Sequence, residues 1–121
     1  MKSYKELEVW QRAMELVTQV YSVSRNFPDV ERYGLTSQIQ RAAVSVPANI
    51  AEGWGRGSRK EYIQFLKIAR GSLMELETHI VVAKALGYIP IPDVEPLEKK
   101  LESVAMMLNR LISRLKEPAS P

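Results

Sequence analysis

Apolar residues recur at helical spacing along most of the chain, most regularly in its second half. In residues 59–86 and again in residues 94–115, an apolar residue returns every three or four positions without a miss. This spacing places them on one face of a helix. They are Tyr62, Leu66, Ala69, Leu73, Leu76, Ile80 and Ala83, then Val94, Leu97, Leu101, Val104, Leu108, Leu111 and Leu115. A 3.5-residue period over three heptads favours near-parallel helix packing.

Two further helices are predicted in the first half, over about residues 6–26 and 36–54. The first has the apolar stripe Leu7, Trp10, Met14, Val17 and Tyr21, and the second has Ile39, Ala43, Val46 and Ile50. Pro47 falls inside the second pattern. Because proline lacks an amide donor and crowds the carbonyl four residues earlier, we expect a kink there rather than a break.

Polar residues at the starts of these segments are predicted to cap them. The predicted N-terminal caps are Ser3 with Glu6, Thr36 or Ser37, Ser58 with Glu61, and Asp93. Serine followed three residues later by glutamate is the spacing of a capping box. Gly87 follows the third segment, where a left-handed residue commonly ends a helix.

The expected fold is therefore all-α, an antiparallel up-down four-helix bundle with a kinked second helix. Residues 1–116 form one domain and residues 117–121 a flexible tail. The third and fourth helices carry more apolar residues than one bundle core needs, namely Phe65, Ile68, Ala105, Met106, Met107 and Ile112. This surplus favours a second buried face and a ring-forming homo-oligomer, although scattered surface apolar residues are also normal.

Composition narrows the class of protein. The 121 residues contain no cysteine, which excludes disulfides and thiolate chemistry. The charged N-terminus lacks the apolar stretch of a signal peptide, and no apolar run approaches the length of a membrane span. We expect a cytoplasmic protein that does not contact the membrane.

Charge is concentrated in the middle of the chain. Residues 32–70 contain seven basic and two acidic side chains, whereas the remainder contains ten basic and twelve acidic ones. A basic centre attracts phosphates or acidic partners, although a solvated helix face has a similar composition. The candidate nucleic-acid-binding residues are Arg41, Arg56, Arg59, Lys60, Lys67 and Arg70, with backbone donors from residues 53–58.

The predicted second helix also carries a line of polar residues beside its apolar stripe. The line consists of Gln38, Arg41, Ser45, Asn49 and Glu52, and Arg56 continues it. Amide, guanidinium, hydroxyl and carboxylate groups in one row can form an ordered hydrogen-bonding interface. It would pair with another subunit, with the third helix, or with phosphates.

Catalytic and metal chemistry find little support in the sequence. His79 is the single histidine, so it would have to serve every role in nucleophilic catalysis. A di-metal bundle needs two Glu-x-x-His motifs, and here Glu75 and His79 stand four apart. We expect no catalytic residues, no metal and no cofactor. An enzyme would need a pocket lined by Glu52, Glu75, His79 or Tyr62.

Three stretches of sequence resemble one family. They are residues 7–13 (LEVWQRA), 38–53 (QIQRAAVSVPANIAEG) and 65–78 (FLKIARGSLMELET). These stretches resemble the bacterial four-helix-bundle proteins encoded in intervening sequences of 23S ribosomal RNA genes. The resemblance runs from about residue 4 to residue 89.

The resemblance implies an up-down bundle that assembles as a ring, as a homopentamer. At the level of fold, it extends to the accessory variability proteins of diversity-generating retroelements, basic bundles that partner a reverse transcriptase and nucleic acid. Two functions follow as hypotheses. One is a non-enzymatic oligomer that binds RNA or DNA through backbone phosphates. The other is an adaptor for a neighbour-encoded enzyme such as a reverse transcriptase.

Overall fold

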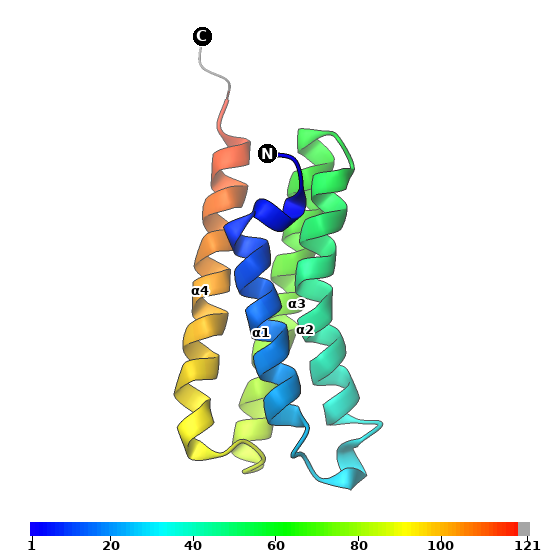
Figure 1. Cartoon of the computed structure of the whole chain (residues 1–121), viewed down its shortest axis with the longest axis vertical. Coiled ribbons are helices and arrows are strands. Elements are labelled where there is room, and N and C mark those ends of the chain that lie inside the picture. The colour runs from blue at the N-terminus through cyan, green and yellow to red at the C-terminus, as the bar shows by residue number, and fades with distance from the viewer. Residues whose placement is uncertain (119–121) are drawn as a thin grey trace.

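A computed structural model of the chain describes residues 1–118. Four long helices, α1 (Glu8–Ser24), α2 (Leu35–Gly55), α3 (Arg59–Ala85) and α4 (Ile91–Lys116), follow one another with the 3-10 turns η1 (Tyr4–Glu6) and η2 (Asp29–Glu31). They run up and down alternately, so the start of α1, the α2–α3 turn and the end of α4 lie at one end (Figure 1). The predicted all-α four-helix bundle is confirmed. Residues 119–121 of the predicted tail lie outside the described residues.

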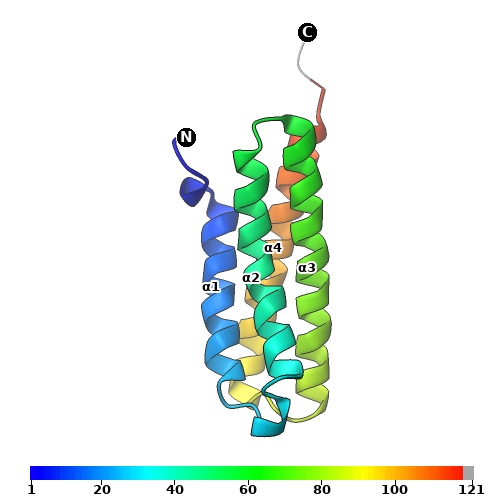
Figure 2. The same ribbon diagram turned by 90° about the vertical axis from the view of Figure 1, so that its right-hand side faces the viewer.

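Each long helix packs against two neighbours, in the order α1, α2, α3, α4 around the bundle (Figure 2). The heptad pattern of α3 is confirmed, because every predicted member from Leu66 to Ala83 is buried and Tyr62 is partly buried. In α4 the pattern holds from Leu97 to Leu108, after which Ile112 enters the core instead of Leu111. Burial of these two apolar stripes is the main stabilising contribution to such a fold.

The apolar stripe predicted for α1 is not the row that the structure buries most fully, although Leu7, Trp10 and Val17 pack against the core. The structure buries Val9, Ala13, Leu16, Val20 and Val23, which step by four and three residues, one position away from the predicted stripe. Met14 and Tyr21 are 37% and 39% exposed. Both rows are apolar and adjacent on the helix, so periodicity alone does not decide which one faces the bundle axis.

Three predicted helix caps are wrong. Ser3 caps the 3-10 turn η1 instead of α1, whose N-cap residue Leu7 makes no side-chain hydrogen bond. Helix α2 begins at Leu35, one residue before the predicted cap, and the Leu35 amide donates to the carboxylate of Glu31 at 3.2 Å. Helix α4 begins at Ile91, so Asp93 lies in its first turn, where a carboxylate favours the positive end of the helix dipole. Ser58 caps α3 as predicted.

Helices α2 and α3 approach each other closely at Gly53. A Cβ atom added there would lie 2.7 Å from the Cβ of Phe65 and 3.2 Å from the ring of Tyr62. Glycine therefore allows close approach of the two helices near their connecting turn. Helix α2 continues through the buried Pro47, as expected, and on past Gly53 to Gly55. Among residues 1–118, no helix has both the length and the apolar character needed to cross a membrane.

Candidate nucleic-acid interface

The antiparallel register divides the charges of the bundle unequally. A hydroxyl contact of 2.9 Å between Ser45 and Ser72 marks the middle of α2 and α3. Residues 1–12, 46–72 and 104–118 lie towards the end with the α2–α3 turn and carry eleven basic and five acidic side chains. Residues 13–45 and 73–103 carry six basic and nine acidic ones. We call these parts the basic half and the acidic half.

Helices α3 and α4 supply the main cations of the basic half. From α3 come Arg59, Lys60, Lys67 and Arg70, all sequence candidates, and from α4 come Arg110, Arg114 and Lys116. Among the described residues, none of the seven has a carboxylate within 4.0 Å. Sequence reasoning missed the α4 cations because the central charge window stopped at residue 70. In an up-down bundle the end of α4 returns to the α2–α3 turn, so the predicted topology already indicated that these cations lie near those of α3.

Arg56 differs from the other predicted cations because it is already paired. Its guanidinium lies 2.8 Å from Glu52 and 3.8 Å from Glu61, and it stacks over the Phe65 ring at 4.7 Å. The N-terminus of α3 is occupied too, since Ser58 accepts from the amide of Glu61 at 3.2 Å. Of the expected anion site at residues 53–58, only residues 56–58 lie outside the helices. Gly53 and Gly55 lie inside α2, and a side-chain cap occupies the start of α3.

Arg41 lies in the acidic half, apart from the other candidates. Together with Gln38 and Ser45 it lines a polar pocket of about 440 Å³ that Ser72 and Glu75 of α3 complete. Asn49 donates to the hydroxyl and the carbonyl of Ser45 at 2.9 and 2.8 Å. The predicted polar line thus lies along the junction of α2 with α3, whereas Glu52, at its end, pairs with Arg56.

Three of the unpaired cations meet between α3 and α4. The guanidinium of Arg70 donates to the side-chain oxygen of Asn109 at 3.2 Å, and Lys67 lies one turn before Arg70. Lys116, the last residue of α4, lies beside them. Repulsion from Lys67 is the main reason that the pKa of Lys116 falls below its ordinary value, and contact with Lys67, slight desolvation and Arg70 also contribute. We call Lys67, Arg70 and Lys116 the cation cluster.

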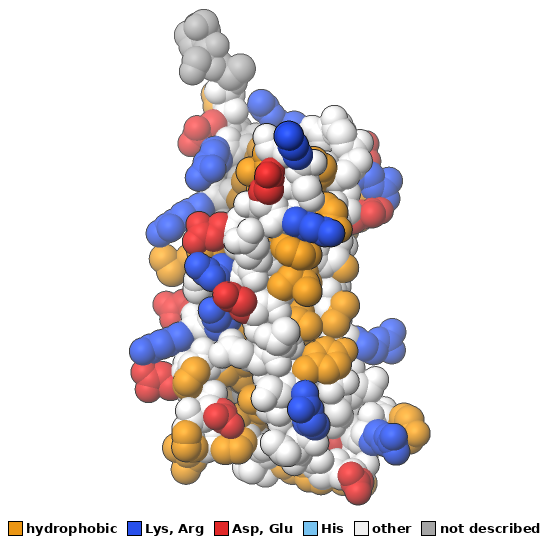
Figure 3. Space-filling view, viewed as in Figure 1, with side chains coloured by type: hydrophobic (Ala, Val, Ile, Leu, Met, Phe, Trp, Pro, Cys, Tyr) orange, Lys and Arg blue, Asp and Glu red, His pale blue; other side chains and the backbone are white. Residues whose placement is uncertain are grey.

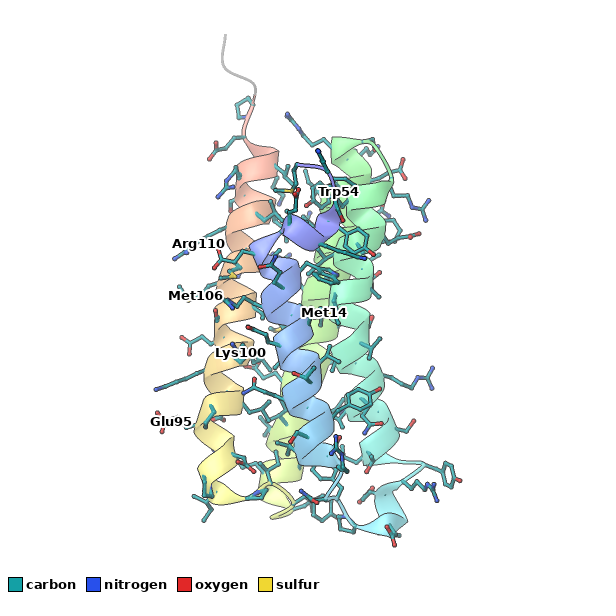
Figure 4. All side chains as sticks on the ribbon, viewed as in Figure 1. Met14, Trp54, Glu95, Lys100, Met106 and Arg110 are labelled. Carbon is teal, nitrogen blue, oxygen red and sulfur yellow. The ribbon has the colours of Figure 1, made fainter. Side chains whose placement is uncertain are left out.

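An apolar column runs down the outer face formed by α1 and α2 (Figure 3). The α1–α2 stripe consists of the exposed Met14, Tyr21 and Val44 with the partly buried Trp10 and Val17. Met14 lies in the middle of this face, and Trp54 continues the apolar surface near the end of α2 (Figure 4). The α1 members of the α1–α2 stripe belong to the apolar stripe predicted from the sequence. The α1–α2 stripe gives the bundle an uncovered apolar surface.

A groove of about 570 Å³ lies between α3 and α4 in the acidic half. Its apolar lining includes Met74, Val81 and Ala105, and Val81 is 55% exposed. Three carboxylates, from Glu77, Glu98 and Glu102, also line the groove, and Glu98 lies 3.6 Å from Lys84. We call this surface the α3–α4 groove. Met106 lies on another part of α4, at its outer edge beside Arg110 (Figure 4).

The residues that an enzyme would have used have other surroundings. Glu75 lies 3.2 Å from His79 on the same helix, and Glu52 pairs with Arg56. The Tyr62 hydroxyl is buried without a hydrogen-bond partner, and its burial raises the pKa of Tyr62. Within residues 1–118, no three carboxylate or imidazole groups come close enough together to hold a metal ion.

Comparisons with known proteins agree with this architecture. In the crystal structure of a protein of unknown function from the S23 ribosomal protein family of Bacteroides thetaiotaomicron VPI-5482, 95% of that chain superposes on 87% of this one. The TM-score is 0.79 at 22% sequence identity, which shows a shared fold. A comparison with curated proteins gave no match. The sequence model of the 23S rRNA-intervening sequence protein family matches residues 5–110. The chain therefore belongs to the 23S rRNA-intervening sequence protein family.

Proposed function

We propose that this protein is a non-enzymatic, self-associating bundle that binds nucleic acid through the phosphate backbone. The observation that carries the proposal is the set of cations without carboxylate partners that α3 and α4 expose in the basic half. Lysine and arginine side chains bind phosphate oxygens, and in doing so they release the counterions condensed on the strand. The family's name, which refers to an intervening sequence of 23S rRNA, supports RNA as the first ligand to test.

Salt dependence tests this proposal directly. Fluorescence anisotropy gives the binding constant for a labelled single-stranded RNA and for the matching DNA. The logarithm of this constant should fall with the logarithm of salt concentration, with a slope of about −0.7 per phosphate contacted. Four to seven contacts would make binding fall steeply between about 0.05 and 0.2 M salt. The absence of binding to either strand at the low-salt end would refute the proposal.

Self-association is supported by two apolar surfaces on different sides of the bundle. The α1–α2 stripe has the basic neighbours Arg25, one turn after Tyr21, and Arg41, one turn before Val44. The α3–α4 groove has three carboxylates instead. We infer that the stripe of one copy packs on the groove of the next. Repeated contacts between two different faces close into a ring when the rotation allows it, and the family resemblance suggests five copies.

Such a ring would also strengthen nucleic-acid binding. Cyclic symmetry places equivalent ends of all subunits on the same side, so the basic halves would form one continuous surface. Several weak phosphate sites on one rigid body raise the effective affinity for a long strand without any new contact. Short strands that reach a single subunit would bind much more weakly than long ones.

Lysine substitutions in the two apolar surfaces test the assembly. Met14→Lys alters the stripe and Val81→Lys alters the groove, and both side chains are exposed in the monomer, so the fold should tolerate them. Each change should convert the protein to a monomer in analytical ultracentrifugation. Met106→Lys is the control, because Met106 is 48% exposed but belongs to neither surface. A stable ring should persist at about 10 μM and below. A wild-type protein that is monomeric at this concentration would refute the ring.

A further inference from the structure

The cation cluster has a feature that general phosphate binding does not explain. Lys67, Arg70 and Lys116 come from two different helices, yet Lys67 and Arg70 lie close enough to Lys116 to lower its pKa, and Arg70 reaches across to Asn109 of α4. The helical spacing agrees with this grouping of the cations. Residues 67 and 70 share a face of α3, and residues 109 and 116 share a face of α4. The hydrogen bond from Arg70 to Asn109 fixes the guanidinium between the two helices.

Nothing in the described part of the chain neutralises these three charges. None of them has a carboxylate within 4.0 Å, and the partner of Arg70 is a neutral amide. The C-terminal end of α4 contributes only about half of a negative charge. Crowding is strong enough to lower the pKa of Lys116, chiefly through Lys67. An anion in this place would relieve the repulsion.

The donors fit a tetrahedral oxyanion. Arginine presents several N–H groups in a planar fork, and a lysine adds a compact point charge with three donors. The Asn109 oxygen already accepts from Arg70, so its amide nitrogen is oriented as a further donor. A phosphodiester carries one negative charge, whereas a phosphate monoester carries between about 1.5 and 2 at neutral pH. Three unneutralised cations match the charge of the monoester better.

We propose that Lys67, Arg70 and Lys116, with Asn109, form a binding site for a phosphate monoester dianion. Because this inference rests on the proposed nucleic-acid binding, the expected source of the monoester is the terminal phosphate of a strand. A free small phosphate has the same chemistry and is distinguished by experiment. The site lies in the basic half, next to the cations proposed to contact the phosphate backbone of the strand.

The test compares two RNA strands of about 12 nucleotides, a length within the usual range for single-strand sites. They share one sequence and an internal label, and one ends in a 5′-phosphate and the other in a 5′-hydroxyl. At about 0.15 M salt the phosphorylated strand should bind roughly tenfold more tightly, as expected for two or three charge-assisted hydrogen bonds. The double variant Lys67→Gln, Lys116→Gln should lose this ratio.

A matched control removes two other cations. The double variant Arg110→Gln, Arg114→Gln lowers the net charge by the same amount as the first double variant. Both of its positions lie on the neighbouring part of α4, outside the cation cluster. It should weaken both strands by the same factor and retain the preference for the phosphorylated end. All four side chains are exposed, so loss of the fold is not expected in either double variant.

Titration with inorganic phosphate is a second test, independent of RNA binding. When it is added to the wild-type protein, the Lys116 ammonium, followed by NMR, should titrate at a higher pH, because the bound anion offsets the repulsion from Lys67. Equal affinity for the two strands would overturn this inference and leave the proposed backbone binding intact. Binding of inorganic phosphate without binding of either strand would refute the proposed function and assign the site to a small phosphate monoester.

Discussion

The two halves of the bundle treat their lysines differently, although Arg25, Arg32 and Arg41 of the acidic half also have no carboxylate within 4.0 Å among residues 1–118. In the acidic half, each of the three lysines has a carboxylate partner: Lys84 with Glu98, Lys99 with Glu95, and Lys100 with Glu15. In the basic half, the seven cations of α3 and α4 described above have none within residues 1–118. The difference lies in the placement of the carboxylates, since basic residues are present in both halves.

This contrast has little consequence for folding, and it matters for the proposed binding of phosphates. An exposed ion pair contributes about 0–1 kcal/mol to stability, so leaving surface cations unpaired costs the fold little. An unpaired cation is available to a phosphate without first breaking an internal contact. The seven cations of α3 and α4 thus stay outside the ion pairs of residues 1–118, whereas the acidic half pairs its lysines within the molecule.

The largest effect should come from neutralising the α3 cations. One variant replaces four cations of the basic half by glutamine, namely Arg59, Lys60, Lys67 and Arg70. Its control replaces four cations of the acidic half, namely Arg32, Lys84, Lys99 and Lys100. Losing four phosphate contacts should lower RNA affinity about 100-fold or more and reduce the salt slope by roughly three units. The control has the same net charge, so anisotropy titrations should show a much smaller change for it. Equal losses would show that only net charge matters.

The next effect concerns the helix contact that supports the basic half. Gly53→Ala should destabilise the protein by about 1–3 kcal/mol, because the new methyl group would lie 2.7 Å from the Cβ of Phe65. Gly55→Ala is the matched change two residues later, with no atom within 4 Å of the new Cβ, and should be neutral or slightly stabilising. Urea unfolding of both variants measures the difference. Equal stabilities would show that α2 and α3 can separate there without cost.

A smaller effect is expected at the boundary of the halves, where Ser45 contacts Ser72 at 2.9 Å. A double-mutant cycle with Ser45→Ala and Ser72→Ala should give a coupling free energy of about 0.5–1.5 kcal/mol, the usual net contribution of a hydrogen bond. Ser45 keeps its contact with Asn49 in the Ser72→Ala variant, which limits the loss from that change alone. Additive effects in urea unfolding would show that the hydroxyl contact does not join the helices.

The smallest effect tests the internal pairing of the acidic half. Hydrogen bonds from Lys100 and Arg12 hold the pKa of Glu15 below its ordinary value of 4.5. A lowered carboxyl pKa stabilises the fold above pH 4.5, and this contribution is lost as the pH falls through the folded-state pKa. Glu15→Gln should therefore lower Tm slightly at neutral pH and leave it unchanged in acid. Glu95→Gln is the control, since its pair with Lys99 lies within one helix. A Tm difference that persists in acid would point to packing instead.

The sequence predicted the fold well because helical periodicity reports burial directly. It identified four helices, the core of α3 from Leu66 to Ala83, and the N-terminal cap at Ser58. It failed on α1, where two adjacent apolar rows compete and only the neighbouring helices determine which one is buried. It also failed at the start of α2, where Glu31, outside the helix, satisfies the amide of Leu35.

The candidate site was predicted only in part, for a topological reason. Counting charge along the chain found Lys67 and Arg70, which lie within one helix. It could not find Lys116, because 46 positions separate it from Arg70 in the sequence and only the return of α4 brings them together. The pairing of Arg56 with Glu52 and Glu61 is likewise a property of side-chain geometry at the end of α2, which residue spacing does not reveal.

The charge imbalance between the halves also makes the molecule an electric dipole directed along the bundle axis. A dipole rotates in the field of an approaching polyanion before any contact forms, and this orientation raises the association rate at low ionic strength. A bundle meeting such a partner would thus arrive with the α2–α3 turn and the end of α4 leading. The alternation of helix direction that places these two segments at one end (Figure 1) consequently sets the direction of approach as well as the chemistry of contact.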